Sequence, residues 1–287
     1  MSLAFEPDPS DFELGNVIAR ATLSRTAQAA AGRLGLGFRF VEPEGYLFAV
    51  SDGVREAVLG SGACSPYAQN PASAYTLCRD KAYTNRLLGR AGLPVIPSRL
   101  FFLDGRRSEW RNPGRERADL ERLSDALIYP VFAKPNMGSR GELAERISSR
   151  EALHDWIGRA AALHETVLIQ PIISGAEYRV FVMDGEAQFS YRKVAANGPA
   201  NLAQGGEIEG FRDGAMPALA ALARGATEVM GLSLAGIDLF DTGGEGRPED
   251  LVLIEVNANP NIESLERVGR DDLIDRIWAA TFRAALG

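Results

Sequence analysis

Two apolar runs near the end of the chain decide the fold: Leu-Ser-Leu-Ala-Gly-Ile-Asp-Leu-Phe-Asp at 232–241 and Leu-Val-Leu-Ile-Glu-Val-Asn-Ala-Asn-Pro at 251–260. We interpret both as buried strands, in which acidic and amide groups cost free energy unless something satisfies them. Alternate residues of a strand share a face, so Glu255 and Asn257 project together, and Asp238 joins them if the two strands pair. Such oxygen ligands suit Mg²⁺, which shares its coordination with substrate phosphates. The runs therefore predict a metal–nucleotide site; the alternative is three partnered polar residues in a sheet.

The composition narrows the class of partner. With 287 residues the chain can form one large domain or two to three lobes. Its net charge of -7 argues against nucleic acid or an anionic membrane as the main partner. No apolar stretch approaches a transmembrane span, and residues 1–9 are unlike a signal peptide. Because only two cysteines occur, we expect no disulfide framework and a cytoplasmic location.

Strands and helices interleave along the chain, which predicts an α+β or mixed α/β protein in several lobes. Two helix starts carry capping signals: Asn70 with Pro71 begins a helix that runs through Leu88, and Ser148 with Glu151 forms a capping box. The remaining expected elements are, in chain order, a helix at 11–36, strands at 37–41, 46–51, 127–134 and 167–170, a hairpin of 178–183 and 187–194 turned by Asp184-Gly185, and helices at 216–230 and 272–286.

Two lysines stand where phosphates can be held. Lys134 ends a predicted strand and precedes a loop with Gly138 and Gly141, whose backbone N–H groups can approach phosphate oxygens. Lys81 lies on the second predicted helix. The loop spacing fits neither a Walker A motif nor a dinucleotide fingerprint. The alternative is a surface turn with two solvated lysines.

The block Gln-Pro-Ile-Ile-Ser-Gly-Ala-Glu-Tyr-Arg at 170–179 reads as a hinge between lobes. Such a hinge can present backbone groups to an adenine and a carboxylate, Glu177, to ribose hydroxyls. The alternative is a plain strand connection with a solvated glutamate.

Three basic side chains and one amide follow the hinge. Arg179, Arg192 and Lys193 lie on the predicted hairpin, and Asn201 lies in a loop of small residues that can fold over phosphates. Arg192 and Lys193 face opposite ways in a strand, so at most one of them reaches any given site. The alternative is that all four are surface residues.

The order of these motifs resembles that of an ATP-grasp protein. The motifs are Asp80-Lys81, Gly-Leu-Pro-Val at 92–95, Tyr-Pro-Val-Phe-Ala-Lys-Pro at 129–135 with its glycine loop, the hinge at 170–179, Gly-Ile-Asp at 236–238 and Ile-Glu-Val-Asn-Ala-Asn-Pro at 254–260. The resemblance covers about residues 70–265 and looks closest to the carboxylate–amine ligase branch, with cyanophycin synthetase, the glutathione synthetase module, the ribosomal-protein glutamate ligase and D-alanine–D-alanine ligase. It implies two α+β subdomains that clamp ATP, at 80–172 and 173–287, after a short N-terminal lobe at 1–79.

The resemblance also implies roles for individual residues. Lys81 and Lys134 would hold ATP phosphates under a lid at 136–141 that includes Gly138, Ser139 and Gly141. The other implied roles are adenine binding by Gln170 and the backbone of Ile172 and Ile173, and ribose binding by Glu177. Asp238, Glu255 and Asn257 would coordinate two Mg²⁺ ions, with Mn²⁺ as an alternative. Arg192 or Lys193 would contact the transferred phosphate, and Asn201 would close over it. We further hypothesise a bidentate pair between Arg140 or Arg179 and a substrate carboxylate.

The implied activity is ATP-dependent ligation of a carboxylate to an amine through an acyl phosphate, with release of ADP and phosphate. Its partners would be a small-molecule carboxylate and an amine, with a free amino acid and a peptide both left open, and with homo-oligomerisation also left open. One alternative is a kinase on the same scaffold, and another is a non-catalytic ATP-binding module. Pro171 removes a backbone donor at the hinge, and the short N-terminal lobe leaves the substrate undetermined.

Overall fold

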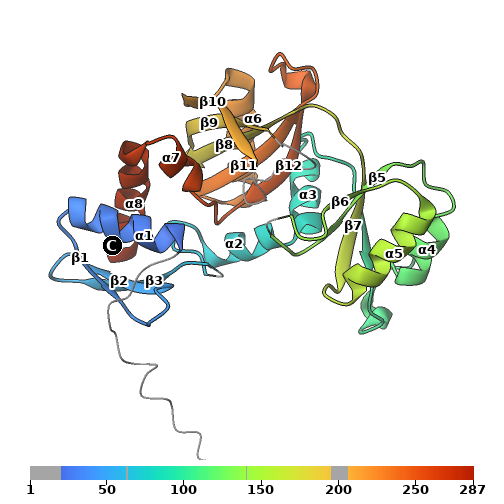
Figure 1. Cartoon of the computed structure of the whole chain (residues 1–287), viewed down its shortest axis with the longest axis horizontal. Coiled ribbons are helices and arrows are strands. Elements are labelled where there is room, and N and C mark those ends of the chain that lie inside the picture. Colours follow the sequence, from blue (N-terminus) through green and yellow to red (C-terminus); the bar gives the residue numbers. More distant parts are fainter. Residues whose placement is uncertain (1–20, 63, 140, 195–205) are drawn as a thin grey trace, which may run out of the picture. The chain divides into compact units, whose positions relative to one another are not determined.

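The computed structural model describes residues 21–62, 64–139, 141–194 and 206–287 (Figure 1). They fall into two compact units. The smaller unit comprises the described residues up to Pro71 together with Ala258–Gly287, and the larger unit comprises those within Ala72–Asn257. None of the helices in these described ranges is long and apolar enough to cross a membrane.

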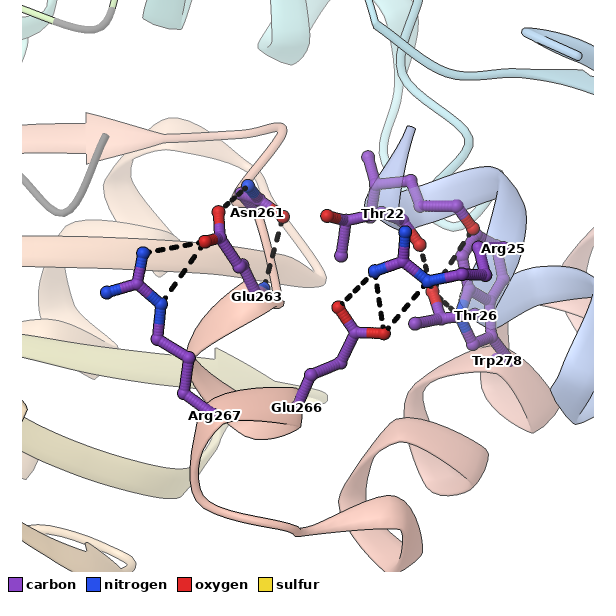
Figure 2. A network of polar contacts seen from close by, with 9 residues as sticks. Thr22, Arg25, Thr26, Asn261, Glu263, Glu266, Arg267 and Trp278 are labelled. Atoms are coloured by element: carbon purple, nitrogen blue, oxygen red, sulfur yellow. Dashed lines mark hydrogen bonds and ion pairs between the residues drawn. The ribbon is translucent and has the colours of Figure 1, made fainter. Parts of the chain in front are cut away.

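The smaller unit packs helices from both ends of the chain against a three-stranded antiparallel sheet. Its elements are α1 (Thr22–Arg33), β1 (Gly37–Phe40), β2 (Leu47–Ser51), β3 (Glu56–Gly60), α7 (Glu263–Arg267) and α8 (Asp271–Leu286). Phe48 and Trp278 are fully buried, and their rings meet edge to face at 6.1 Å. Trp278 Nε1 donates to Thr26 Oγ1 at 3.0 Å, which satisfies the indole inside this core (Figure 2).

Ion pairs join the first helix of the smaller unit to its C-terminal helices. Arg25 of α1 forms a bidentate pair with Glu266 of α7, with the Nη2 and Oε2 atoms 2.6 Å apart (Figure 2). Arg33 of α1 pairs in the same way with Asp275 of α8. Because these pairs are partly exposed, each contributes at most about 1 kcal/mol. The buried aromatic core is therefore the main source of stability here.

The larger unit contains two antiparallel sheets, each with helices of its own. The four-stranded sheet has the order β4-β7-β5-β6 and packs with α4 and α5 around Trp156, which is fully buried. Its elements are β4 (Arg99–Phe102), α4 (Arg117–Leu123), β5 (Val131–Pro135), β6 (Glu145–Ile147), α5 (Arg150–Ala161) and β7 (Thr166–Pro171).

The second sheet has five strands in the order β10-β9-β8-β11-β12, and α6 packs on it (Figure 1). Asp184 and Gly185 both have positive φ, so the predicted hairpin turn is confirmed. The elements of this part are α2 (Ala72–Arg79), α3 (Lys81–Arg90), β8 (Ala176–Met183), β9 (Glu186–Val194), β10 (Glu207–Asp213), α6 (Pro217–Met230), β11 (Leu234–Asp241) and β12 (Leu251–Asn257).

Two predicted helix boundaries are wrong for the same physical reason, which is side-chain capping. The helix expected to run through Leu88 ends at Arg79, because the Asp80 carboxylate accepts the backbone N–H of Tyr83 at 2.9 Å and starts α3. The cap of α5 is Ser149, whose hydroxyl accepts the N–H of Ala152, one residue after the Ser148 that we expected.

The helix expected at 11–36 is described only as α1, which ends at Arg33, and Gly35 follows with a φ of +69°. Elements that the sequence pattern did not predict are β3, β4, β6, β10, α4 and α7.

Candidate functional site

A pair of lysines, one near the end of strand β5 and one at the start of helix α3, forms the first part of the site. Lys134 lies on β5, is only 7% exposed, and has no hydrogen-bond partner for its Nζ among the described residues. Burial lowers the pKa of Lys134, the carboxylate of Glu255 opposes this effect, and the charge of Lys81 lowers the pKa further. A buried cation without a partner is costly, so this position favours an external anion.

Lys81, the first residue of α3, lies at the same place. Its Nζ donates to the backbone oxygen of Gly138 at 2.9 Å and lies 3.8 Å from Glu255 Oε1. We call Lys81 and Lys134 the lysine pair. Glu255 is the one carboxylate within 4.0 Å of either Nζ among the residues that the structure describes.

Asn136 holds the lysine pair together, and the sequence reasoning missed it. Its side-chain Oδ1 accepts the backbone N–H of Ala82 at 2.9 Å, and its own backbone oxygen accepts the N–H of Lys81 at 3.3 Å. Asn136 is 2% exposed. It therefore fixes the start of α3 to the end of β5. The available signal was an amide placed between the Lys-Pro strand end and the glycine loop.

The register of the five-stranded sheet places the predicted metal ligands on one face. Asp238 of β11 lies directly opposite Glu255 of β12, and Gly236 lies opposite Asn257. Opposite residues share a face, as do residues two apart, so Asp238, Glu255 and Asn257 project together. The two strands do pair, which meets the condition for Asp238 to join the other two residues, and Asn257 Nδ2 donates to Asp238 Oδ2 at 3.3 Å.

Four charges from three strands form a second group on this face. Arg179 of β8 lies opposite Asp238, and Glu177 of β8 lies opposite Lys193 of β9. Arg179 makes a bidentate pair with Asp238 at 2.5 and 2.7 Å. Lys193 Nζ lies 2.5 Å from Glu177 Oε1 and 3.0 Å from Asp238 Oδ1. We call Glu177, Arg179, Lys193 and Asp238 the balanced cluster, because its two cations meet two carboxylates.

The pKa values of the balanced cluster follow from burial and from these pairs. Burial alone would raise the pKa of Asp238, but Arg179 and Lys193 lower it to about 2. Burial alone would lower the pKa of Lys193, but Asp238 and Glu177 hold it above its ordinary value. Burial raises the pKa of Glu177, and Lys193 counteracts only part of this rise. The pairs therefore keep Asp238 ionised.

The structure separates several other predicted residues from these two groups. Arg192 faces away from Lys193, is half-exposed, and lies 3.7 Å from Glu209 of β10, so the prediction that the two side chains point in opposite directions is confirmed. Arg179 gives its guanidinium fork to Asp238, a carboxylate of the chain itself, where we expected a substrate carboxylate. Arg140 and Asn201 lie outside the described residues.

The structure also gives the positions of the described residues of the hinge and of the glycine loop. Gln170 is buried at the end of β7, and Ile172 and Ile173 follow it with intermediate exposure. Gly138 and Ser139 are exposed, and Gly141 has a φ of +73°, which is typical of glycine. The Gly138 carbonyl, which Lys81 holds, ties this loop to α3.

Two of the three predicted metal ligands have oxygen atoms free to bind a hard cation such as Mg²⁺. Glu255 makes no side-chain hydrogen bond among the described residues, and Asn257 uses its Nδ2 group, which leaves its side-chain oxygen available. The carboxylate of Asp238 already accepts four donors, from Arg179, Lys193 and Asn257. Glu255 and Asn257 are therefore the ready oxygen ligands, and Asp238 joins only by giving up a donor.

Comparison with known families and structures shows which family contains this arrangement. The chain belongs to the family of RimK-like ATP-grasp domains, whose model matches residues 78–280. Among solved structures it is similar to a D-Ala:D-Ser ligase, VanG from Enterococcus faecalis, with a TM-score of 0.55, 19% identity, and coverage of 74% of this chain and 64% of that one. It is also similar to the ATP-grasp ligase PsnB complexed with a minimal precursor, with a TM-score of 0.52, 20% identity, and coverage of 75% and 64%. The predicted α+β ATP-grasp fold is thereby confirmed.

Curated relatives in sequence are named as glutamate ligases. A probable alpha-L-glutamate ligase of Hydrogenovibrio crunogenus is 29% identical over 220 residues, which cover 74% of this chain and 66% of that protein. A coenzyme gamma-F420-2:alpha-L-glutamate ligase of Methanococcus maripaludis is 27% identical over 213 residues, covering 71% and 67%. The chain spans between 40% and 66% of the length of the first three curated relatives that it matches.

Proposed function

We propose that this chain is an ATP-dependent carboxylate–amine ligase that activates a carboxylate as an acyl phosphate and joins it to an amine. One observation carries the proposal: a buried, unpartnered Lys134 stands with Lys81 beside a single carboxylate, Glu255, whose strand also holds Asn257. This site has an excess of positive charge where nucleotide phosphates would lie and oxygen ligands next to it. The family and the names of its relatives support the same activity.

The roles of the residues follow from their charge and burial. Lys134 and Lys81 would neutralise and orient the phosphates, in a water-poor position where each charge acts strongly. Glu255 and the side-chain oxygen of Asn257 would hold Mg²⁺, with Asp238 completing the set. When bound, the ion supplies charge neutralisation at the phosphates.

The balanced cluster would position the reacting groups. Arg179 and Lys193 hold the Asp238 carboxylate in one orientation from two strands. Lys193, on the same face, would be the hairpin cation that approaches a transferred phosphate, because Arg192 faces away. Gln170 with the backbone of Ile172 and Ile173 would meet the adenine. The four-stranded and five-stranded sheets would then be the two halves that clamp ATP.

The substrate class is an amino acid or a peptide. The relatives are named for the ligation of L-glutamate, which supports an α-amino acid as the amine and leaves glutamate as the first candidate. A peptide carboxylate is the second candidate, because PsnB, a structural neighbour, is complexed with a precursor.

The test is ADP release measured over a matrix of free amino acids, dipeptides and small carboxylates. The proposal expects release that requires both a carboxylate and an amine, with an amide product detected by mass spectrometry. Hydroxylamine added in place of the amine should give a hydroxamate, because only an acyl phosphate is trapped in this way. A stable phosphorylated product without hydroxamate would show a kinase instead, and nucleotide binding without turnover on any substrate would show a non-catalytic module.

A further inference from the structure

The larger unit contains a large pocket that shares Asn85 of α3 with a small pocket lined by Lys81 and Glu255. The large pocket has a volume of about 520 Å³, within the range of ligand sites, and lies between α3, the segment 95–100 and the loop at 113–115. None of the candidate phosphate, metal or hinge residues lines it. Three arginines line it: Arg86 from α3, Arg99 from β4 and Arg115 from the loop.

The charge in this pocket is uncompensated within the described chain. No aspartate or glutamate of the described residues lines it, and none lies within 4.0 Å of Arg86, Arg99 or Arg115 in an ion pair. The carboxylate next to Arg115 in sequence, Glu116, is taken by Arg111 at 3.1 Å. Residues 72–128 contain eleven lysines and arginines against seven acids, although the whole chain has a net charge of -7. The pocket is therefore a basic site on an acidic protein.

Hydrogen bonds and a ring contact hold the residues that line the pocket in position. Asn85 of α3 donates from one Nδ2 atom to the backbone oxygen of Ile96 at 2.9 Å and to Ser98 Oγ at 3.1 Å. These bonds hold the segment before β4 against α3. Arg99 lies over the ring of Phe101, with its guanidinium carbon 5.4 Å from the ring centroid, which limits its freedom.

The pocket also contains the free edge of a strand. β4 is the first strand of its sheet and pairs with β7 on one side. On its other side Phe102 is bridged to Glu116, so the open part of this edge is at Leu100. Leu103 directs its N–H to Glu165 in the chain segment before β7, while Phe102 directs its N–H outward to Arg115. Backbone groups alternate along a strand, so Leu100 also directs its N–H and C=O outward, into the pocket that it lines. An open edge of this kind accepts an extended peptide.

We propose that this pocket docks an extended acidic peptide segment, whose backbone pairs with the edge of β4 at Leu100 and whose carboxylates meet Arg86, Arg99 and Arg115. The three arginines favour a negatively charged ligand. The unpaired backbone groups at the strand edge favour a peptide over a compact anion, because a peptide can form hydrogen bonds with them. Guanidinium groups suit carboxylates because two parallel N–H groups match two oxygens. Docking here goes beyond ligation and does not require the candidate nucleotide site to be active.

The experiment measures fluorescence anisotropy of a fluorescein-labelled octaglutamate with the full chain at low ionic strength, without nucleotide. Arg86→Ala, Arg99→Ala and Arg115→Ala should each weaken binding about fivefold or more, which corresponds to the loss of one charge-assisted contact. Arg90→Ala is the matched control, because Arg90 lies on α3 but does not line the pocket. An equal loss in Arg90→Ala would overturn the proposal by showing attraction to the basic surface in general.

Three further probes separate the alternatives. Octaglutamine should not bind, and an octaglutamate with every second backbone nitrogen methylated should bind several-fold more weakly, since it cannot pair with a strand. Citrate at equal carboxylate concentration should compete poorly, and excess ATP should not displace the peptide. Equal binding of the methylated peptide would overturn the proposal by showing that no strand pairing occurs. Equal competition by citrate would overturn it by showing a site for small anions. Displacement by ATP would overturn it by showing that the peptide binds in the nucleotide site.

Discussion

The lysine pair and the balanced cluster lie in the same unit and differ in one respect, which is whether the chain supplies its own counter-charges. In the balanced cluster, Arg179 and Lys193 meet Asp238 and Glu177 at 3.0 Å or less. In the lysine pair, two cations share Glu255, which lies 3.8 Å from Lys81 Nζ. The cluster is complete within the protein, whereas the pair needs an anion from outside.

This difference assigns separate physical tasks to the two groups. A complete cluster of buried charges fixes geometry, because each group is held by partners on neighbouring strands. In an incomplete group a buried charge such as Lys134 lacks a nearby counter-charge, which in the proposed function the nucleotide would supply. Positioning would thus be the task of the balanced cluster and anion binding that of the lysine pair.

Loss of Glu255 should have the largest effect on activity. Glu255→Ala removes the carboxylate of the lysine pair and a ready oxygen ligand, so we expect ATP turnover to fall on the order of 1,000-fold, equivalent to several kcal/mol of transition-state stabilisation. The measurement is steady-state ADP release. Glu249→Ala, an exposed glutamate just before β12, is the control and should keep its activity. Turnover within tenfold of the native value in Glu255→Ala would sink the proposed role.

Mutations in the balanced cluster should lower the stability of the protein more than mutations in the lysine pair. Arg179→Met leaves Asp238 buried with Lys193 as its remaining cation, and breaking a buried pair in this way should lower the free energy of unfolding by about 3–5 kcal/mol. Urea denaturation measures the change. Arg192→Met is the matched control, because Arg192 lies on a neighbouring strand in a half-exposed pair worth at most about 1 kcal/mol. Equal losses of stability in the two variants would show that the buried cluster is no more important to folding than an exposed pair.

Mutation of the lysine pair should change the stability of the protein in the opposite direction, by raising it. Lys134→Met removes a buried charge that has no hydrogen-bond or ion-pair partner in the described chain, so the free energy of unfolding should rise by about 1 kcal/mol. Nucleotide affinity should fall in the same variant, on the order of 100-fold for the loss of a buried charge contact. Calorimetry gives both quantities, and Lys134→Arg, which keeps the charge, should restore part of the affinity. Destabilisation as large as that of Arg179→Met would show that Lys134 has a structural partner.

The sequence alone predicted what depends on short spacing. The common face of Glu255 and Asn257 follows from the two-residue period of a strand, and the hairpin follows from Asp184-Gly185. The pairing of Asp238 with Glu255 needed one further condition, that the two runs pair as strands, and the structure meets it.

Contacts between distant strands were beyond this reasoning. Arg179 and Asp238 are separated by 59 positions, and their bidentate pair depends on the register of β8 against β11, which no local pattern specifies. Arg179 was therefore assigned to a substrate carboxylate. The break at Asp80 was missed because aspartate is tolerated within a helix, and only the geometry shows its side chain on the N–H of Tyr83.

The smallest expected effect lies in the pH dependence of Lys134. Its pKa in the folded protein is lower than in the unfolded chain, where an ordinary lysine titrates near about 10.4. Between the two values the unfolded chain binds more protons, so the contribution of Lys134 to stability should increase as the pH rises through this range. Nucleotide affinity should decrease over the same range, because the neutral amine no longer attracts phosphate.

Titrations of nucleotide binding and of urea unfolding across the alkaline range should therefore change in opposite directions. In Lys134→Arg both trends should weaken, since a guanidinium stays charged throughout. Lys193, whose pKa is raised, behaves in the reverse way: its stabilising contribution is complete below the pKa of the unfolded chain and is lost as the pH rises through its higher folded value. An alkaline loss of affinity that persists in Lys134→Arg would assign the titration to another group and remove this distinction between the lysine pair and the balanced cluster.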